Sequence, residues 1–572
     1  MSGEPADGPL KRRIRETRRI WGRPARTEPD PELPGAKIDE PKPGAVLERG
    51  FVQLAGWALI PEGPVDRIDV TIDGEPFSRA RLCVTRPDLP DTFAMPGAIA
   101  GGFQCVLDLT GLPPSATEVT IGGKVTGRTG LTFDLPQQTW PVAPRDEVID
   151  PDPERSALLR ARCREIADRS PRPSGGIAGE GPKILAITHN IALGGGQLVM
   201  LELLRRFASE HGMTGAVVAP KDGATRGDLE AAGYAVHVAG DYPVDEIEGY
   251  EGRLAELVAW AAPQHFDVVL VNTMLAFPAG DLAARLGLPA VWIVHESYGL
   301  EGYWATFEKD GLHPYVRERG AEAFRSAARI IFEVDATKEL FRGSAGSAPL
   351  STLPYGIDIA AHDREIERLD RGRVRSELGY EPGEFIILCL GTLEPRKGQI
   401  QLVKAFSRIS AEHPEARLVL VGALDNGYDE EVEDAVEMFG VADRVDIHPV
   451  TPDIANHYVA SDLLVCASDV ESLPRTVLEA MAFRLPVMAT DVFGLPEVIE
   501  EGRTGWIVES RDTGAMAEGL VRAIGAGPEE RHRIAEAARA LVEAEHDSPA
   551  CSARYAEVIR EVTATGGSVV ED

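Results

Sequence analysis

The sequence predicts an α/β protein in which a small all-β sandwich precedes two doubly wound domains. Between residues 44 and 140, short runs of alternating apolar residues are separated by turn signals, and no segment of helical period intervenes. From residue 182 onward, apolar runs alternate with helix-length segments, and the alternation restarts after a charged stretch near residue 363. Because strands that are apolar throughout must be covered on both faces, each alternating half predicts a parallel sheet between two layers of helices.

The length and the charge bound the class of protein. At 572 residues the chain exceeds what one hydrophobic core supports. Its formal charge of −32 argues against the broad basic surface that nucleic acid requires, so we expect no nucleic-acid partner. No apolar run reaches the length of a membrane-spanning helix. The six scattered cysteines and the lack of an apolar leader favour a reduced, cytoplasmic protein without structural zinc.

Residues 1–43 predict a flexible tail. Between Lys11 and Arg26 the chain carries eight Lys or Arg residues against one Glu, and residues 28–43 are rich in Pro, Asp and Glu. The basic stretch has two interpretations. A solvated tail is favoured. The other is peripheral contact with the inner face of an anionic membrane, where each basic residue adds about 1 kcal/mol.

Residues 44–140 predict the sandwich. The runs FVQLAGWALI, RIDVTIDGEPF, GFQCVLDL, EVTIGGKV and GLTFDL have the length and alternation of strands. Asp73-Gly74 suits a two-residue hairpin turn, in which both positions take positive φ. Trp57 lies in the first run. Because a single Trp on a strand is typical of a buried core, we assign it no sugar-binding role.

The rest of the chain predicts a linker, two domains and a terminal segment. Residues 141–181 predict a linker with one helix in the run SALLRARCREIADR, and residues 182–360 the first α/β domain, with strands such as KILAIT and FDVVLVN. Residues 361–545 predict the second domain, with strands such as FIILCLG and LLVCAS, and residues 546–572 a helix and tail. Ligands of open α/β sheets lie at the carboxyl ends of strands, so two such domains can jointly hold one pair of substrates.

A glycine loop is the first candidate site. The strand KILAIT runs into HNIALGGGQ, where Gly195 and Gly196 open a helix. Without side chains in the way, backbone amides at a helix N-terminus can approach a phosphate or a sugar. A glycine run between strand and helix is about as often a tight turn. The polar residues beside this loop are His189, Asn190 and Gln197.

A basic pair is the second candidate site. The strand FIILCL of the second domain runs into GTLEPRKGQ, which places Arg396 and Lys397 just before the next helix. Two adjacent cations suit a diphosphate and would neutralise charge that develops on a departing nucleotide. A solvated basic pair explains these two residues equally well on their own.

The third candidate site lies in ASDVESLPRTVLEAMAFRLPV, where Glu479 follows Glu471 by eight residues. Pro474 suits a first helical turn, so we expect Glu471 in the preceding loop and Glu479 about one turn inside the helix. Both carboxylates can then face a ligand at the helix mouth, where the amides of Ser472 and Leu473 would bind a phosphate. With 91 acidic residues in the chain, this spacing also arises by chance.

These segments together resemble the family-four retaining glycosyltransferases. Residues 461–508, with the E-x7-E spacing of Glu471 and Glu479 and the run DVFGLPEVIEEGRTGWIV, resemble the donor-site signature of that family. The GGGQ loop, the WIVHES strand end, the PYGID run and the EPRKG loop follow in the family's order. The resemblance covers both α/β domains and implies the GT-B fold of two Rossmann-like domains. Residues 44–140, through GWAL, VTIDG, Arg86-Pro87-Asp88 and GGF, resemble the sandwich modules of some bacterial glycosyltransferases.

The resemblance implies a role for each candidate. Glu479 would bind the ribose hydroxyls of the nucleotide, and Glu471 would hydrogen-bond the transferred sugar. Arg396 and Lys397 would hold the diphosphate. His295, which by itself is more often a hydrogen-bonded core residue, would lie near the sugar and the reacting hydroxyl. The other candidates would line the donor site (Gly195, Gly196, Ser472, Leu473 and Pro474) or face the acceptor (Gln197 and Asn190).

The resemblance also implies a mechanism. In front-face transfer the departing diphosphate takes the proton of the acceptor while the anomeric carbon passes through an oxocarbenium-like state. Because basic side chains would neutralise the leaving group, we expect neither a catalytic metal nor a cofactor beyond the nucleotide-sugar donor. In this fold the C-terminal helix is expected to return to the first domain.

Two positions depart from the family pattern. Thr392 stands where many members carry Arg, and Arg396 can compensate for it. Tyr355 stands where Asn is frequent, which bears on the interdomain hinge more than on chemistry. Neither departure indicates loss of function.

Two alternatives stay open. A non-catalytic carbohydrate-binding or scaffold protein is disfavoured by the intact donor residues, and a nucleotide-sugar epimerase or hydrolase lacks an acid or base aimed at another carbon. The sequence leaves open the nucleobase and sugar of the donor, the acceptor, which can be a glycan or lipid-linked, and the oligomeric state.

Overall fold

A computed structural model describes most of the chain. The described residues are 33–143 except 48, 50, 62, 85, 87, 88, 90–99, 110, 111, 114, 128 and 129; residues 161 and 163; and 181–564 except 193, 309 and 310. They divide into two compact units, one drawn from Met1–Arg145, Ala361–Val470 and Glu479–Ala540, the other from Asp146–Ala360, Glu471–Leu478 and Leu541–Asp572. The basic stretch from Lys11 to Arg26 and nearly all of the predicted linker helix lie outside the described residues. None of the described helices is both long and apolar enough to cross a bilayer.

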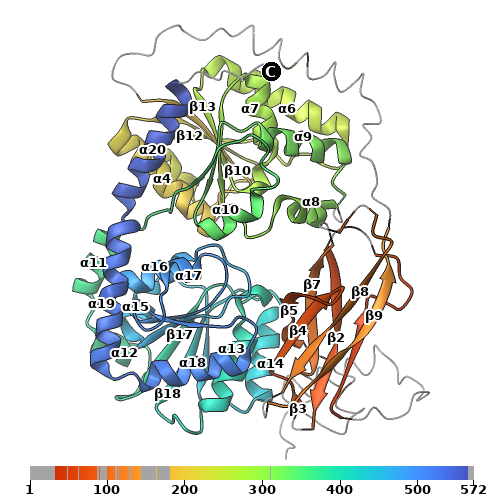
Figure 1. Cartoon of the computed structure of the whole chain (residues 1–572). Helices are drawn as coiled ribbons and strands as arrows, with labels where there is room; N and C mark the ends of the chain where they lie inside the picture. Colours follow the sequence, from red (N-terminus) through yellow and green to blue (C-terminus); the bar gives the residue numbers. More distant parts are fainter. Residues whose placement is uncertain are drawn as a thin grey trace, which may run out of the picture. The chain divides into compact units, whose positions relative to one another are not determined.

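The described strands of the amino-terminal region form two antiparallel sheets (Figure 1). One has the order β1-β2-β7-β6, with β3 beside β2, and the other the order β5-β4-β8-β9. Asp73 and Gly74 have φ values of 51° and 86°, so the predicted hairpin turn joins β4 to β5. The strands are β1 Gly35–Glu40, β2 Phe51–Ile60, β3 Gly63–Pro64, β4 Arg67–Ile72, β5 Glu75–Arg79, β6 Arg81–Val84, β7 Gly102–Asp108, β8 Glu118–Thr126 and β9 Thr132–Pro141. We call this part the all-β region.

Strand β1 corrects the predicted start of the all-β region at residue 44. Its sequence, GAKIDE, lies in the stretch assigned to the tail, yet it pairs antiparallel with β2, and Ile38 is buried. Pairing gives the backbone of this short segment its hydrogen-bond partners, which composition alone does not reveal. Trp57 is buried beside Leu59 and Leu89, as expected of a core residue.

The second α/β domain belongs to the same unit. Its strands are all parallel, in the order β19-β18-β17-β20-β21-β22. The strands are β17 Phe385–Leu390, β18 Ala416–Ala423, β19 Val445–Pro449, β20 Leu463–Cys466, β21 Val487–Thr490 and β22 Trp506–Val508. The helices are α11 Ile359–Arg368, α12 Arg371–Glu377, η4 Pro395–Lys397, α13 Gln399–Ile409, α14 Tyr428–Met438, α15 Ile454–Ala460, α16 Arg475–Ala482, α17 Leu495–Val498, α18 Thr513–Gly525 and α19 Pro528–Glu545, of which α11, α16 and α19 cross the boundary between the two units.

The all-β region and the second α/β domain share one hydrophobic core. Buried side chains of both, such as Leu82 and Cys83 of β6 and Leu402 and Phe406 of α13, belong to a single continuous cluster. Helix α13 packs directly against β6. The all-β region is therefore a fixed part of this unit, which the sequence did not predict.

The first α/β domain forms the other unit. Its parallel sheet has the order β12-β11-β10-β13-β14-β15-β16, with α4 and α20 on one side and α6, α7 and α9 on the other (Figure 1). Helix α20 packs against α4 and β13. The strands are β10 Lys183–Thr188, β11 Thr214–Ala219, β12 Tyr234–Val238, β13 Val268–Asn272, β14 Ala290–Val294, β15 Arg329–Phe332 and β16 Leu350–Thr352. The helices are α4 Gly195–His211, α5 Arg226–Ala231, α6 Ile247–Ala261, η2 Ala262–Gln264, η3 Met274–Ala276, α7 Pro278–Leu286, α8 Leu300–Glu308, α9 Pro314–Arg325, α10 Asp335–Phe341 and α20 Ser548–Ala564. The fold class predicted from the sequence is thus confirmed, with an all-β region before two parallel α/β domains.

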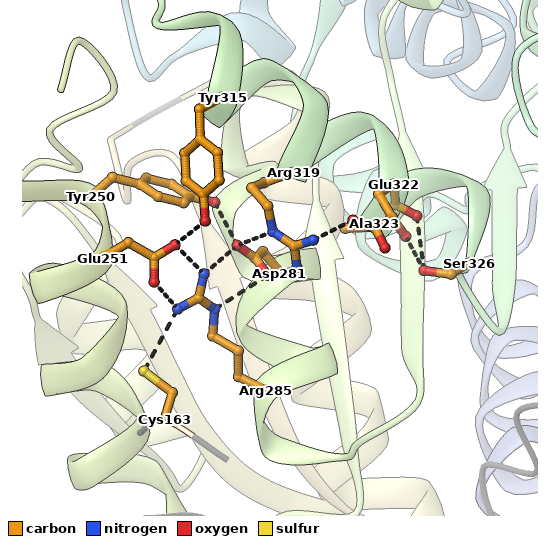
Figure 2. A network of polar contacts seen from close by, with 10 residues as sticks. All are labelled: Cys163, Tyr250, Glu251, Asp281, Arg285, Tyr315, Arg319, Glu322, Ala323 and Ser326. Atoms are coloured by element: carbon orange, nitrogen blue, oxygen red, sulfur yellow. Dashed lines mark hydrogen bonds and ion pairs between the residues drawn. The ribbon is translucent and has the colours of Figure 1, made fainter. Parts of the chain in front are cut away.

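A buried ionic cluster ties α6, α7 and α9 together (Figure 2). The guanidinium group of Arg285 lies 2.6 Å from a carboxylate oxygen of Glu251 and 2.8 Å from one of Asp281. Arg319 pairs with the other oxygen of Asp281 at 2.6 Å, and the hydroxyl of Tyr315 donates to Glu251. Burial by itself raises the pKa of Asp281, but the two arginines lower it more strongly. The carboxylates of Glu251 and Asp281 are therefore both paired with arginine, as buried charges require.

Candidate functional site

Polar side chains gather at the carboxyl ends of neighbouring strands in the first α/β domain. In the register of the sheet, Thr188 of β10 lies beside Asn272 of β13, and Val294 of β14 lies beside Phe332 of β15. His189 follows β10 directly, His295 follows β14 and Glu333 follows β15. Because the strands are parallel, these residues meet at one edge of the sheet, where ligands of such sheets bind.

His295 is held by hydrogen-bond acceptors on both ring nitrogens. Its Nδ1 lies 2.5 Å from Oε1 of Glu333, and its Nε2 lies 2.9 Å from Oδ1 of Asn272. The amide nitrogen of Asn272 is itself used, because it donates to the carbonyl oxygen of Gly196 and to the hydroxyl of Thr188. An ionised carboxylate and an amide oxygen only accept hydrogen bonds, so these two neighbours favour a ring that donates from both nitrogens.

The charges around His295 support this protonation state. Burial by itself lowers the pKa of His295, but the carboxylates of Glu333 and Glu296 more than offset it, so the pKa is raised. Glu296 accepts from the backbone amides of Met274 and His295. His189 behaves in the opposite way, because burial and the nearby His295 both lower its pKa. The surroundings therefore favour the protonated form of His295 and the neutral form of His189.

The glycine loop lies against His295. A Cβ atom added to Gly196 would lie 3.0 Å from Cδ2 of His295, whereas one added to Gly195 would meet nothing within 4 Å. Helix α4 begins at Gly195, and no described side chain caps it. Gly196 is thus needed for close packing, and Gly195 leaves open space at the helix N-terminus, where an anion is favoured.

The predicted acceptor residues are bonded to one another. Gln197 donates to Oδ1 of Asn190 at 3.0 Å and lies 3.1 Å from Nε2 of His189. Nδ1 of His189 in turn lies 3.0 Å from the hydroxyl of Thr273. Thr273 has φ of 72°, a strained conformation for a β-branched residue and one found most often at functional sites. The structure therefore places Gln197 and Asn190 in one set of hydrogen bonds, next in sequence to Gly196 and Asn272, which belong to the set around His295.

In the second α/β domain the basic pair lies in η4, between β17 and α13. Arg396 lies 2.7 Å from Glu394, and its guanidinium group donates to the carbonyl oxygen of Val470 at 3.2 Å. The amide of Asp469 donates to the carbonyl oxygen of Arg396 at 2.7 Å. Lys397 follows in the same turn and ends η4. The loop after β17 and the loop after β20 are thus bonded to each other.

Gly398 allows the close approach of these two loops. Its φ is 69°, and an added Cβ would lie 2.0 Å from the carbonyl oxygen of Ala467. No other residue fits here without moving the backbone. Steric fit therefore explains why glycine stands at this position of the EPRKG run.

Glu479 lies within α16, as predicted, and its carboxylate is oriented by a tyrosine. The hydroxyl of Tyr458 on α15 donates to Oε2 of Glu479 at 3.0 Å. Tyr458 is buried and stacks on Phe483, with ring centroids 5.0 Å apart. Sequence reasoning missed Tyr458, as it missed Asn272 and Glu333 in the first domain. Asn272 ends β13 and Glu333 directly follows β15, and this position at a strand end is the feature that could have identified them from the sequence.

The segment from Glu471 to Leu478 is grouped with the first α/β domain. There the hydroxyl of Tyr355 donates to the carbonyl oxygen of Leu473 at 2.8 Å. Ser472 is buried, and its hydroxyl has no hydrogen-bond partner among the described residues. Pro474 directly precedes α16, and Glu471 is half-buried in the loop before it. Tyr355, a departure from the family pattern, thus holds the backbone of this loop.

The described part of the chain contains no cluster of three or more His, Cys, Asp or Glu side chains arranged as metal ligands. The donor candidates instead combine two cations in η4 with a carboxylate on α16. Such a set can hold the phosphates and hydroxyls of a nucleotide.

Two families match the chain over most of its α/β part. Residues 193–361 match the family described as Glycosyltransferase Family 4, and residues 370–541 match the family described as Glycosyl transferases group 1. A D-inositol 3-phosphate glycosyltransferase of Actinosynnema mirum is 30% identical over 305 residues, which are 50% of this chain and 72% of that protein.

Two further proteins are similar. A GDP-mannose-dependent alpha-(1-6)-phosphatidylinositol monomannoside mannosyltransferase of Mycolicibacterium smegmatis is 30% identical over 247 residues, 41% of this chain and 61% of that protein. Anabaena Alr3699/HepE, crystallised in complex with UDP and glucose, matches 66% of this chain and 99% of that chain at 23% identity, with a TM-score of 0.56. This last likeness shows a shared fold.

Proposed function

Because the chain belongs to the group 1, family 4 glycosyltransferases, we propose that it transfers a sugar, with retention of configuration, from a nucleotide-diphosphate donor to a hydroxyl group. The family makes it a glycosyltransferase that uses a nucleotide sugar. The observation that carries the proposal is the pair of bonded loops that present Arg396 and Lys397, in the same unit as the Tyr458-oriented Glu479. We propose no catalytic metal and no further cofactor.

In the proposed donor site, Glu479 accepts hydrogen bonds from the ribose hydroxyls. The hydroxyl of Tyr458 donates to Oε2 of Glu479 and so holds the carboxylate in place before the donor binds. Because the carboxylate is already ordered, less entropy is lost on binding. Arg396 and Lys397 bind the diphosphate, with Gly195 and Gly196 and the loop Ser472 to Pro474 as further donor contacts. Glu471 hydrogen-bonds the transferred sugar.

The protonation of His295 supports an electrostatic rather than a general-base role. With both ring nitrogens donating, His295 cannot accept the proton of the attacking hydroxyl. That proton then goes to the departing diphosphate. The acceptor oxygen bonds to the anomeric carbon on the face that the diphosphate leaves, and this gives retention. The cations Arg396 and Lys397 stabilise the diphosphate as its charge grows.

We propose that the acceptor is a hydroxyl of a glycan, a glycolipid or another polyol. Gln197, Asn190 and His295 would face it. Relatives are named for an inositol phosphate and for a phosphatidylinositol monomannoside, which supports a polyol or glycolipid as the acceptor class. We also propose that residues 11–26 make peripheral contact with an anionic membrane. A separate proposal is that the all-β region is related to the sandwich modules of some bacterial glycosyltransferases.

Acceptor-dependent sugar release tests the proposal. With a bound nucleotide sugar, we expect release of the nucleotide diphosphate only when an acceptor is added, and equally with a metal chelator present. A non-catalytic scaffold would bind sugars without releasing the nucleotide, and a hydrolase would release it without acceptor. Either result would contradict glycosyl transfer as proposed.

A further inference from the structure

Buried charges fix the all-β region to the second α/β domain. Asp66, which precedes β4, lies 2.7 Å from the guanidinium group of Arg408 and accepts from the hydroxyl of Thr513. Lys404 donates to the carbonyl oxygen of Val65 at 2.6 Å. Asp66, Lys404 and Thr513 are all buried. Together with the shared core, these contacts hold the two parts in one orientation.

A second set of contacts lies at β5. Arg79 lies 2.7 Å from Glu509 and donates to the carbonyl oxygen of Ser510 at 3.2 Å. In return, the guanidinium group of Arg511 donates to the carbonyl oxygen of Arg79 and lies 3.3 Å from the hydroxyl of Ser78. The loop before α18 is therefore bonded to the edge of the all-β region.

Arg511 also contacts the loop after β20, which is hydrogen-bonded to Arg396. Its Nε lies 3.3 Å from Oδ2 of Asp469, a buried carboxylate. Burial raises the pKa of Asp469 to about 6, and the charges of Arg511 and Arg81 act in the opposite direction. Asp469 in turn donates its amide to the carbonyl oxygen of Arg396 at 2.7 Å. One side chain thus connects the all-β region to a residue of the proposed donor site.

The backbone of Arg511 indicates that its side chain matters. Its φ is 55°, in the left-handed region that glycine adopts without strain and other residues adopt at a cost. Local structure alone would favour glycine at this position. The contacts that compensate for this conformation are those of the guanidinium group with Ser78, Arg79 and Asp469.

We propose that Arg511 is a positioning residue for nucleotide-sugar binding. It holds Asp469 against the all-β region, and Asp469 holds the backbone of Arg396 in place. The all-β region is in this way part of the donor-binding machinery. This inference rests on the proposed function, in which Arg396 binds the diphosphate.

The test compares Arg511→Gly, Arg511→Lys and Arg67→Ala. Arg511→Gly relieves the backbone strain but also removes the contacts of the guanidinium group with Ser78, Arg79 and Asp469. Because these two effects oppose each other, the melting temperature should change little. Because the variant loses the ion pair that orders the loop of Asp469, the donor KM should rise about tenfold. The change in kcat should be smaller. Arg511→Lys, which keeps the charge, should restore part of the loss. Arg67→Ala is the control, because Arg67 also bridges the two parts, to Asp512, but does not reach Asp469.

Amide hydrogen exchange at Asp469 tests the inference without substrate. It should be faster in Arg511→Gly than in the wild type and in Arg67→Ala. Unchanged exchange and an unchanged donor KM in Arg511→Gly would overturn the positioning role, as would equal losses in Arg67→Ala. If the wild type binds no nucleotide sugar, the proposed function fails, while the exchange experiment still decides whether Arg511 orders the loop.

Discussion

At the residue scale, the most informative finding is the hydrogen-bonded setting of His295, which favours its protonated form. A strand-end histidine is often neutral, but here each ring nitrogen faces an oxygen that can only accept. Sequence patterns predicted where His295 lies and could not predict its state. The state depends on Glu333 and Asn272, which come from other strands and reach His295 only through the register of the sheet.

Glu333→Gln should lower the pKa of His295, because burial stays while the main opposing carboxylate loses its charge. In the wild type the raised pKa contributes stability that is fully present below the ordinary histidine pKa of about 6.5 and is lost as the pH rises through the folded-state pKa. The variant should lose this pH dependence. NMR titration of the His295 ring and melting curves on both sides of neutrality measure both effects. Glu322→Gln, which neutralises an exposed carboxylate beside Arg319, is the control. An unchanged His295 titration in Glu333→Gln would contradict the role of Glu333.

Tyr458→Phe should weaken donor binding without unfolding the protein. The variant keeps the stacked ring and removes one hydrogen bond to Glu479, which is worth about 1 kcal/mol or a factor of about five. Titration calorimetry with the donor measures the change. Equal affinity of Tyr458→Phe and wild type would show that the hydroxyl does not orient Glu479 for binding.

At the scale of elements, the sequence predicted most strands, because buried parallel strands are apolar throughout. It missed β1, whose GAKIDE run is short and lies among prolines and acids. It identified the loops after β17 and β20 separately and could not show that they touch. That contact depends on Gly398, whose need for a left-handed backbone and for space beside Ala467 appears only in three dimensions.

Gly398→Ala tests the contact between these loops. The substitution adds backbone strain of about 1–2 kcal/mol and drives a Cβ into the carbonyl oxygen of Ala467, so the loop must move and donor affinity should fall. Gly427→Ala is a matched control, because Gly427 also has positive φ, of 84°, but open space around it. Similar donor affinity in the two variants would mean that the contact does not shape the site.

The buried cluster of Figure 2 should carry much of the stability of the first α/β domain. Glu251→Gln removes one charge and leaves Arg285 without full compensation, which typically costs about 3–5 kcal/mol. Urea unfolding measures the loss. Arg226→Ala, which breaks exposed pairs on α5, should leave the unfolding midpoint unchanged. A similar midpoint for Glu251→Gln and wild type would show that the cluster is not a source of stability.

At the scale of the whole molecule, the structure changes the expected organisation. The sequence predicted the all-β region as a separate accessory domain, because its boundary is a Pro-rich linker. The structure joins it to the second α/β domain through a common core and through pairs such as Asp66 with Arg408. Charged residues more than 300 positions apart look like solvated surface in a sequence, so this joining could not be predicted.

Deletion of residues 1–143 should therefore destabilise the second α/β domain, because it uncovers apolar side chains that the shared core buries. Deletion of residues 1–32 removes none of the described all-β strands and should leave the melting temperature unchanged. Differential scanning calorimetry of both truncated proteins measures the difference. A wild-type melting temperature for the α/β part after the larger deletion would contradict the shared core.

We propose that this chain binds a nucleotide sugar through Glu479 and the loop of Arg396 and Lys397. The most direct test is titration calorimetry of UDP-, GDP- and ADP-sugars against the wild type and Glu479→Ala, with a metal chelator present. We predict that one of these nucleotide sugars binds the wild type tightly and that Glu479→Ala loses this binding. If none of them binds the wild type, or if the variant binds as well as the wild type, the proposed donor site is wrong.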